Sequence, residues 1–491
     1  MSKGIQLGAV LPSARQLERR ALSLGVANAF DYAIQFLVPV VLVRCLDAAD
    51  FGDYRLLWLA VGTVMSVATL AMPGSLYYFL PRSDAATKRL YINQTLLFLA
   101  TSGLISGWAV SAWNPWLPEK MHVLTADEAI VPAFVALWVI AALLDALPTV
   151  DERVTWQAKM IIRLSAIRGV ALSLAAFLTH DLESVLLALL AFVIFKVAVL
   201  LRYVAQHHDL RAPLLRWRAF AGQLSYAAPL GVAGALYGLR AQSDQWVAAA
   251  LFPLGMFAAF SIAAVLGPLM NLFRLSVNFA FLPSMSRLEA AGDVSGMLKL
   301  NSQANVMVAM LLCPLFAFVF VFAEELVTII YTGTYVGAAP VMRVYILGLA
   351  GLLIELATIT MLLRQAPFVM AVNLMALIIA AGLNWLFARQ IGLAGAAVGS
   401  VAAIYLDRVA TLWRISRRTR VPMRRLQNWG ALAQPMLFSA LAAAFAWALV
   451  DRYFAASGPQ VRVTVGGVLL LAAYGTLQGL FRLGRGRARR L

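Results

Sequence analysis

The sequence predicts an all-α protein that crosses a membrane many times. Hydrophobic residues make up 62% of the 491 residues. Only 13% are charged, against about 25% in an ordinary soluble domain. This composition carries too little charge for the surface of a soluble enzyme and too much apolar surface for a disordered chain. Apolar runs long enough to span a bilayer recur along almost the whole sequence.

The apolar runs divide the chain into about fourteen predicted membrane-spanning helices, at about 20 residues for each span. Each run is bounded by a short stretch that contains polar or charged residues. The helices are expected at 21–43, 56–80, 91–110, 129–148, 160–179, 185–204, 222–239, 255–281, 302–322, 341–362, 367–388, 396–413, 430–450 and 463–481.

The distribution of Lys and Arg predicts the topology. Most of them fall in alternate segments, namely 1–20, 81–90, 149–163, 202–220, 284–299, 363–366, 414–429 and 482–491. The opposite loops hold only Arg44, Arg55, Lys120, Arg240, Arg389, Arg452 and Arg462. Because basic loops stay in the cytoplasm, we expect both chain ends there. The net charge of +17 then reflects topology, and no nucleic-acid partner is expected.

Two sequence patterns recur and predict an internal repeat. Residues 51–54 and 254–257 both read apolar–Gly–any–aromatic, and residues 79–82 and 281–284 both begin Phe-Leu-Pro. The spacing predicts two parallel six-helix lobes related by an axis along the membrane normal. The expected parts are a cytoplasmic N-terminal segment 1–20, an N-lobe 21–204, a cytoplasmic linker 205–221, a C-lobe 222–413, a basic cytoplasmic loop 414–429, two further helices 430–481 and a basic cytoplasmic tail 482–491.

The loops and cysteines argue against an enzyme. The largest predicted outer loop, 112–128, is too short for an extramembrane catalytic domain, and the sequence has no Gly-rich loop for ATP phosphates. Cys45 and Cys313 cannot build a Cys-rich metal site, and the four histidines are scattered. No cofactor and no metal are expected.

Ionisable residues inside the predicted helices mark candidate functional sites, because each costs about 3 kcal/mol at the bilayer centre without a partner or a wet cavity. The candidates for a substrate cavity are Asn28, Asp31, Gln35, Arg168, Lys196, Tyr237, Arg240, Asn271, Arg274 and Asn278. Asp31 and Glu355 are also candidates for coupling an ion. Asp145, Arg343, Asp407 and Arg408 lie near helix ends, and we expect them at the membrane interface without a special role.

Two interpretations of these residues remain open. Polar stripes on helices avoid lipid, so they line a cavity or pack against other helices. In the packing interpretation, Asp31 forms a structural pair with an arginine. In the cavity interpretation, the guanidinium and ammonium groups bind a phosphate-bearing substrate.

Four short motifs, in order, resemble those of a known family. They are Phe51-Gly52-Asp53-Tyr54, Pro283-Ser284-Met285-Ser286-Arg287, Gly333-Thr334-Tyr335-Val336-Gly337-Ala338-Ala339 and Gly392-Leu393-Ala394-Gly395-Ala396-Ala397. The chain resembles the Wzx-like flippases of O-antigen, lipopolysaccharide and exopolysaccharide biosynthesis. These belong to the multidrug/oligosaccharidyl-lipid/polysaccharide (MOP) exporter superfamily. The resemblance covers about residues 20–425.

The resemblance implies a V-shaped transporter of the bacterial cell inner membrane. Its cargo would be an oligosaccharide on undecaprenyl diphosphate, moved by alternating access and driven by an H⁺ or Na⁺ gradient. The implied partners are the lipid-linked oligosaccharide, the phospholipid bilayer, and a polysaccharide polymerase with its chain-length machinery. A monomer suffices, since both lobes are in one chain.

Three alternatives stay open at this point. A drug/cation antiporter of the same superfamily would share the fold but would favour an acidic cavity. A lipid-linked peptidoglycan precursor is another cargo for the same architecture. A polytopic O-antigen ligase or polymerase would need a large outer loop with acid/base residues, which the sequence lacks.

Overall fold

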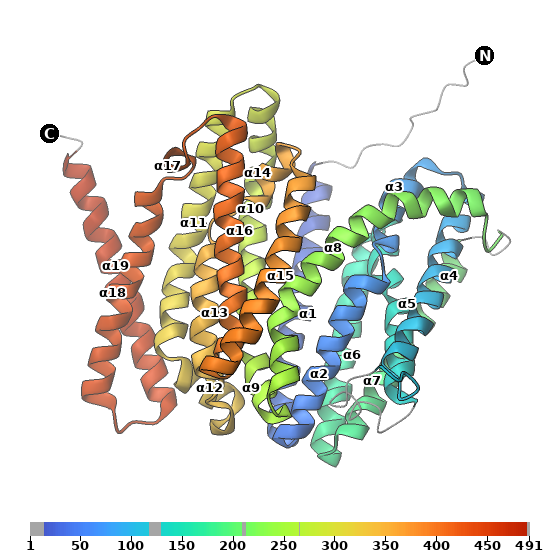
Figure 1. Ribbon diagram of the computed structural model, residues 1–491, viewed down its shortest axis with the longest axis horizontal. Coiled ribbons are helices and arrows are strands. Elements are labelled where there is room, and N and C mark those ends of the chain that lie inside the picture. Colours follow the sequence, from blue (N-terminus) through green and yellow to red (C-terminus); the bar gives the residue numbers. More distant parts are fainter. Residues whose placement is uncertain (1–13, 117–128, 209–212, 265, 489–491) are drawn as a thin grey trace. The chain divides into compact units, whose positions relative to one another are not determined.

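The computed structural model describes residues 14–116, 129–208, 213–264 and 266–488. In these ranges every regular element is a helix and none is a strand (Figure 1). The predicted all-α fold is therefore confirmed.

The helices follow one another with short connections. They are α1 (Ala14–Cys45), α2 (Ala48–Ala68), α3 (Met72–Phe79), α4 (Ala85–Ala109), α5 (Ile130–Val150), α6 (Val154–Thr179), α7 (Leu182–His207), α8 (Trp217–Leu251), α9 (Leu254–Ala263), α10 (Leu266–Ala290), α11 (Val294–Val321), α12 (Ala323–Tyr331), α13 (Ala338–Leu352), α14 (Ala357–Leu362), α15 (Ala366–Ile391), α16 (Gly395–Thr419), α17 (Met423–Leu426), α18 (Trp429–Phe454) and α19 (Pro459–Ala488).

Side chains just before several helices explain where those helices begin. Asp84, Asp181, Asp293 and Asn428 precede α4, α7, α11 and α18, and each accepts a hydrogen bond from a backbone N–H of the first turn. These N–H groups have no partner within the helix, so a capping oxygen fixes the first residue of each helix.

Each predicted span coincides with helical structure, but three of them are pairs of helices. The predicted span 56–80 is α2 and α3, 255–281 is α9 and α10, and 341–362 is α13 and α14. The chain bends by 41° after α2, where Leu70 and Ala71 adopt the left-handed conformation. Apolar composition alone does not reveal such breaks, because apolar residues continue on both sides of each break.

Among the described residues, nine helices are long and apolar enough to cross a membrane, or ten if the bent pair of α2 and the following segment counts as one span. The chain is thus a multi-pass membrane protein. The count of about fourteen spans, and the orientation of the chain ends, stay predictions.

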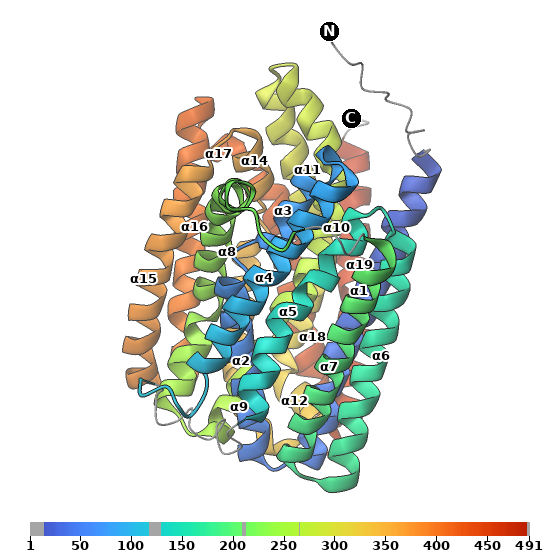
Figure 2. The ribbon, with the colours of Figure 1, turned by 90° about the vertical axis from the view of Figure 1, so that its right-hand side faces the viewer.

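The chain forms two compact units. Unit 1 comprises the described residues within Met1–Val41, Ala68–Leu117 and Thr125–Leu230, and unit 2 those within Leu42–Val67, Pro118–Leu124 and Gly231–Leu491. In unit 1, α5 packs against α4, α6 and α7 (Figure 2). In unit 2, α15 packs against α16, α10 against α11, and α18 against α11 and α19. The predicted division into lobes stays a prediction.

Two copies of the apolar–Gly–any–aromatic pattern meet within unit 2. Gly52 on α2 faces the start of α9, and a Cβ atom at Gly52 would lie 2.5 Å from the carbonyl oxygen of Leu254. A Cβ atom at Gly255 would lie 3.4 Å from Cβ of Ala48. A side chain at Gly52 would therefore separate the two helix ends, which explains why the first pattern needs glycine.

Candidate functional site: two polar cavities

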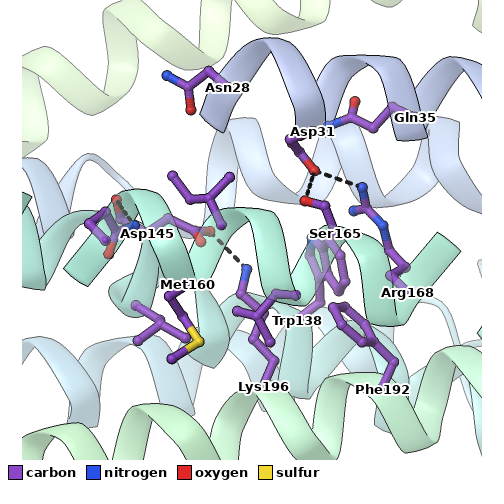
Figure 3. Close-up of a pocket in the computed structure, with 14 residues that line it drawn as sticks. Asn28, Asp31, Gln35, Trp138, Asp145, Met160, Ser165, Arg168, Phe192 and Lys196 are labelled. Carbon is purple, nitrogen blue, oxygen red and sulfur yellow. Dashed lines mark hydrogen bonds and ion pairs between the residues drawn. The ribbon is translucent and has the colours of Figure 1, made fainter. Parts of the chain in front are cut away.

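A cavity of about 320 Å³ lies inside unit 1. Its walls come from α1, α5, α6 and α7, and Figure 3 shows how their polar side chains converge. Five of the predicted cavity residues line it, namely Asn28, Asp31, Gln35, Arg168 and Lys196. The structure thus brings these five together.

Asp31 is the hydrogen-bonding centre of this cavity. Its Oδ1 atom accepts hydrogen bonds from Ser165 Oγ at 2.5 Å and from Arg168 Nη2 at 3.0 Å. Its Oδ2 atom accepts one from Gln35 Nε2 at 2.6 Å, one turn further along α1. The charge of Asp31 is therefore balanced by Arg168, and both carboxylate oxygens have partners.

Lys196 is paired as well, which corrects the expectation for Asp145. Lys196 Nζ donates to Asp145 Oδ2 at 2.9 Å and lies 5.1 Å from the ring centroid of Trp138. Asp145 was expected at an interface without a special role, but it lines the cavity. Its pairing with Lys196 follows from the packing of α5 against α7, which position along one helix does not reveal. The place of Asp145 relative to the membrane stays a prediction.

A second cavity, of about 470 Å³, lies inside unit 2. Three arginines line it, Arg240 on α8, Arg274 on α10 and Arg408 on α16. Tyr237, another predicted cavity residue, lines it too, and the guanidinium of Arg240 lies 5.6 Å from its ring centroid. The side chains of Asn271 and Asn278, also predicted for the cavity, lie outside the described residues.

Glu355 lies in the break between α13 and α14 and forms an ion pair with Arg274. Arg274 Nη1 lies 2.8 Å from Glu355 Oε2, and the Glu355 side chain is only 6% exposed. Glu355 was expected inside a continuous helix, but α13 ends at Leu352 and α14 begins at Ala357. Its Oε1 atom accepts from the backbone N–H of Ala357 at 2.6 Å, at the start of α14. The carboxylate therefore balances an arginine and caps a helix.

Neighbouring side chains satisfy the backbone of this break. Asn301 Nδ2 donates to the carbonyl oxygen of Glu355 at 3.0 Å, and Asn305 Oδ1 accepts from its N–H at 3.1 Å. Arg408 Nη1 donates to the carbonyl oxygen of Ile354 at 3.1 Å. Non-helical backbone inside a membrane is tolerated where protein groups satisfy it, and residues of α11 and α16 do so here.

Asp407 and Arg408 correct the sequence analysis in the same way as Asp145. Both were expected at the interface, yet Arg408 lines the unit 2 cavity. Asp407 Oδ2 lies 3.3 Å from Arg408 Nη2 and 3.8 Å from Arg240 Nη1. Arg240 and Arg408 therefore share the carboxylate of Asp407.

Arg343 is the fourth residue that was expected at the membrane interface. It pairs with Glu324 at 3.0 Å and does not line either cavity.

A further polar cluster lies where α7 meets the turn after α5. Asp151 Oδ2 accepts from Tyr203 Oη at 2.8 Å and lies 2.9 Å from His208 Nε2. Burial raises the pKa of Asp151, but the hydrogen bonds from His208 and Tyr203 outweigh it and bring the pKa below its usual range. Among the described residues, no group of three or more His, Cys, Asp or Glu could hold a metal ion.

The sequence analysis missed several residues that line the cavities, among them Trp138, Gln157 and Phe192 in unit 1. In unit 2 it missed the cavity positions of Arg408 and of Tyr345, whose hydroxyl donates to Asp244 Oδ2 at 2.9 Å. Gln157 gave no signal because it falls in the predicted cytoplasmic segment 149–163, whereas α6 begins at Val154. The two aromatic residues gave none, because aromatic residues are common throughout such helices.

Comparison with known proteins places the chain in a family. A family model described as "Polysaccharide biosynthesis protein" matches residues 41–340. The chain belongs to this family. The resemblance to a polysaccharide biosynthesis family, which the sequence motifs predicted, is confirmed. No curated protein shows significant sequence similarity to the chain.

Solved structures of membrane transporters share the fold. The lipid II flippase MurJ in an inward closed conformation superposes with a TM-score of 0.70 at 13% identity, over 93% of this chain and 98% of MurJ. An inward-facing multidrug resistance MATE transporter gives 0.57 at 12% identity, over 84% of this chain and 97% of that chain. A mutant of the Vibrio cholerae MATE transporter VcmN gives 0.52 at 12% identity, over 84% of this chain and 98% of that chain. At these identities the likeness concerns the fold alone.

Proposed function

We propose that the protein is a flippase that moves a polyprenyl-diphosphate-linked oligosaccharide, an O-antigen, capsule or exopolysaccharide unit, across the bacterial cytoplasmic membrane. The observation that carries the proposal is the convergence of Arg240, Arg274 and Arg408 on the unit 2 cavity. The predicted lobes 21–204 and 222–413 would alternate in exposing the cavity to the two sides of the membrane. A monomer would suffice for transport, and a polysaccharide polymerase would be a partner of the flippase.

The three arginines suit a diphosphate. Guanidinium groups bind phosphate oxygens through paired N–H donors. Arg240 Nη1 and Arg408 Nε are buried donors that have no hydrogen-bond partner among the described residues, and buried N–H groups without acceptors are costly. A diphosphate in the cavity would supply acceptors to both. Membership of a polysaccharide biosynthesis family supports a cargo that carries sugar.

Glu355, which lines the cavity, and Asp407, which pairs with two of its arginines, offer a route for coupling to an ion gradient. Glu355 pairs with Arg274, and Asp407 lies between Arg240 and Arg408. A bound diphosphate would compete with both carboxylates for the same guanidinium groups. A carboxylate that loses its arginine inside the membrane is costly to keep charged, so Glu355 would take up a proton or Na⁺ when the cargo binds. Asp31 would do the same in unit 1 if Arg168 moved.

A drug/cation antiporter is the other function to consider, because MATE transporters share the fold. A cationic drug needs a carboxylate that is free to bind it. Asp31 and Glu355 each already pair with an arginine, at 3.0 Å and 2.8 Å respectively. Asp244, which also lines the unit 2 cavity, accepts hydrogen bonds from the Tyr345 hydroxyl at 2.9 Å and from the backbone N–H of Gln245 at 2.7 Å. The structure therefore favours an anionic cargo.

The test is transport in vesicles that contain the purified full-length protein. Lipid-linked oligosaccharide that accumulates in a deletion strain is loaded into one leaflet, with and without a pH or Na⁺ gradient. Protein-dependent movement of the intact lipid to the other leaflet is the expected result, and the effect of each gradient identifies the driving ion. Efflux of a cationic dye without lipid movement would replace the flippase by an antiporter.

Two variants make the test specific for the arginine cavity. Arg408→Gln should reduce lipid movement about 100-fold if the guanidinium contributes about 3 kcal/mol to binding the diphosphate. Arg343→Gln is the matched control, since Arg343 pairs with Glu324 outside both cavities and should transport normally. Equal transport by the two variants would remove the arginine cavity from the mechanism.

A further inference from the structure

In the unit 1 cavity each cation has a carboxylate of its own, whereas in the unit 2 cavity Arg240 and Arg408 share Asp407. Arg168 pairs with Asp31, and Lys196 pairs with Asp145. Each cation has its own carboxylate, so the four groups carry no net charge. An anionic ligand would have to displace a carboxylate from each cation that it bound, whereas a neutral ligand could bind without displacing any.

Several hydrogen-bonding groups remain available beside these pairs. Gln157 is only 3% exposed and lines the cavity, yet its Oε1 atom is buried without a hydrogen-bond partner among the described residues. A buried acceptor without a donor costs about 1–3 kcal/mol, so a donor from a ligand would be strongly favoured. The carboxamide of Asn28 also lines the cavity and is exposed.

Aromatic rings complete the wall. Trp138 on α5 and Phe192 on α7 line the same cavity (Figure 3), with ring centroids 6.3 Å apart. Lys196 lies 5.1 Å from the Trp138 centroid and helps to fix the orientation of the indole. The cavity therefore combines apolar ring surface with amide, hydroxyl and carboxylate groups. Its volume of about 320 Å³ suits a small-molecule subsite, for which about 300–1,000 Å³ is typical.

We propose that the unit 1 cavity is a carbohydrate subsite that binds part of the sugar of the cargo. A sugar ring has hydroxyl groups that both donate and accept hydrogen bonds, and an apolar C–H face that packs on an indole ring. Gln157 Oε1 accepts from a hydroxyl, Asn28 donates to and accepts from others, and Trp138 packs on the C–H face. The inference rests on the proposed function, since it assumes that the cargo carries sugar.

Separate binding measurements distinguish this subsite from the flippase proposal. The full-length protein in lipid nanodiscs is titrated by calorimetry with two probes. The first is the free oligosaccharide, released by mild acid from the lipid that accumulates in a deletion strain. The second is undecaprenyl diphosphate without sugar. Trp138→Ala and Gln157→Leu should each weaken oligosaccharide binding about tenfold, the equivalent of 1.4 kcal/mol, and leave binding of the sugar-free lipid unchanged.

Control variants keep the result interpretable. Trp108→Ala removes an exposed tryptophan of α4 that does not line the cavity, and its oligosaccharide affinity should equal that of the wild type. Trp138→Phe retains an aromatic ring and should lose less affinity than Trp138→Ala. Unchanged binding of sugar-free lipid shows that each variant is folded.

The outcomes separate the two proposals. Wild-type affinity for the oligosaccharide in both Trp138→Ala and Gln157→Leu would overturn the subsite. So would a wild-type protein that binds the sugar-free lipid but not the oligosaccharide, and the flippase proposal would stand. A wild-type protein that binds neither probe would overturn both proposals.

Discussion

The cavities of the two units contain similar side chains but distribute their charges differently. In unit 1, Arg168 and Lys196 each have a carboxylate of their own. In unit 2, Arg240 and Arg408 share the carboxylate of Asp407, and Arg274 pairs with Glu355. Arg240 Nη1 and Arg408 Nε are buried without a hydrogen-bond partner among the described residues, whereas no nitrogen of Arg168 or Lys196 is in that position there. The pairing of the cations, more than their number, therefore decides which cavity suits an anion.

The helices that carry the cavities also differ. The unit 1 cavity is lined from α1, α5, α6 and α7, each continuous where it borders the cavity. The unit 2 cavity borders the break between α13 and α14, where Glu355 lies. A break of this kind can absorb a change in backbone angles more readily than a continuous helix. We therefore expect cargo binding to move Glu355 more than any residue of the unit 1 cavity.

The largest effect is expected from Arg274→Ala. The change leaves Glu355 buried without its cation, which costs about 3–5 kcal/mol for a buried pair, and it removes one guanidinium from the proposed diphosphate site. Transport should be lost, and the melting temperature should fall. Thermal unfolding in detergent and vesicle transport measure the two effects.

The double variant Arg274→Ala/Glu355→Ala separates these effects. It removes the stranded carboxylate, so we expect most of the thermal stability to return while transport stays absent. Recovery of transport in the double variant would mean that Arg274 serves the fold and not the cargo.

Asp407→Asn should strengthen binding of the diphosphate, and the effect should be of intermediate size. It neutralises the carboxylate that Arg240 and Arg408 share, so a diphosphate no longer competes with it. We expect sugar-free undecaprenyl diphosphate to bind about tenfold more tightly, a gain of about 1.4 kcal/mol. Calorimetry in nanodiscs measures the change. Asp145→Asn in unit 1 is the matched control and should leave this affinity unaltered.

Lys196→Met should have a smaller effect on stability than Arg274→Ala. The Asp145 side chain is 59% exposed, so water can solvate it after its partner is lost, and exposed pairs contribute only about 0–1 kcal/mol. The melting temperatures of the two variants, measured side by side, test this order. A loss in Lys196→Met as large as in Arg274→Ala would contradict the contrast between the two cavities.

The smallest effect is a dependence on pH at Asp151 in unit 1. Because its pKa is lowered in the folded protein, the ionised carboxylate contributes stability at pH values above its ordinary pKa of about 3.9. That contribution is lost as the pH falls through the lowered pKa. Asp151→Asn should therefore melt below the wild type at pH 7 and converge with it in strong acid. A difference that persists unchanged at the lowest pH would contradict this account.

The sequence contained enough information for the fold class and for part of the site. Long apolar runs admit only helices in a bilayer, because each helix satisfies its own backbone. A charged residue in such a run needs a partner or a wet cavity, and on this ground Asp31, Arg168, Lys196, Arg240 and Arg274 were singled out; all five line the two cavities.

Other features had no signal along the chain. The break at Glu355 is capped by its own side chain and satisfied by Asn301 and Asn305 of another helix. The partners of Lys196 and Arg240 are Asp145 and Asp407, far away in sequence. Nearness to a helix end suggested that these two acids were interfacial, and tertiary packing placed them beside cations.

The helical, membrane-spanning character of the chain and its intramembrane cations follow from composition and local backbone hydrogen bonding, so they are legible along the chain. The pairing of each carboxylate with its cation, and thus the cavity in which buried guanidinium nitrogens lack acceptors, depends on how the helices pack. Coulomb and hydrogen-bond energies change over distances of a few ångströms, and helix packing sets those distances.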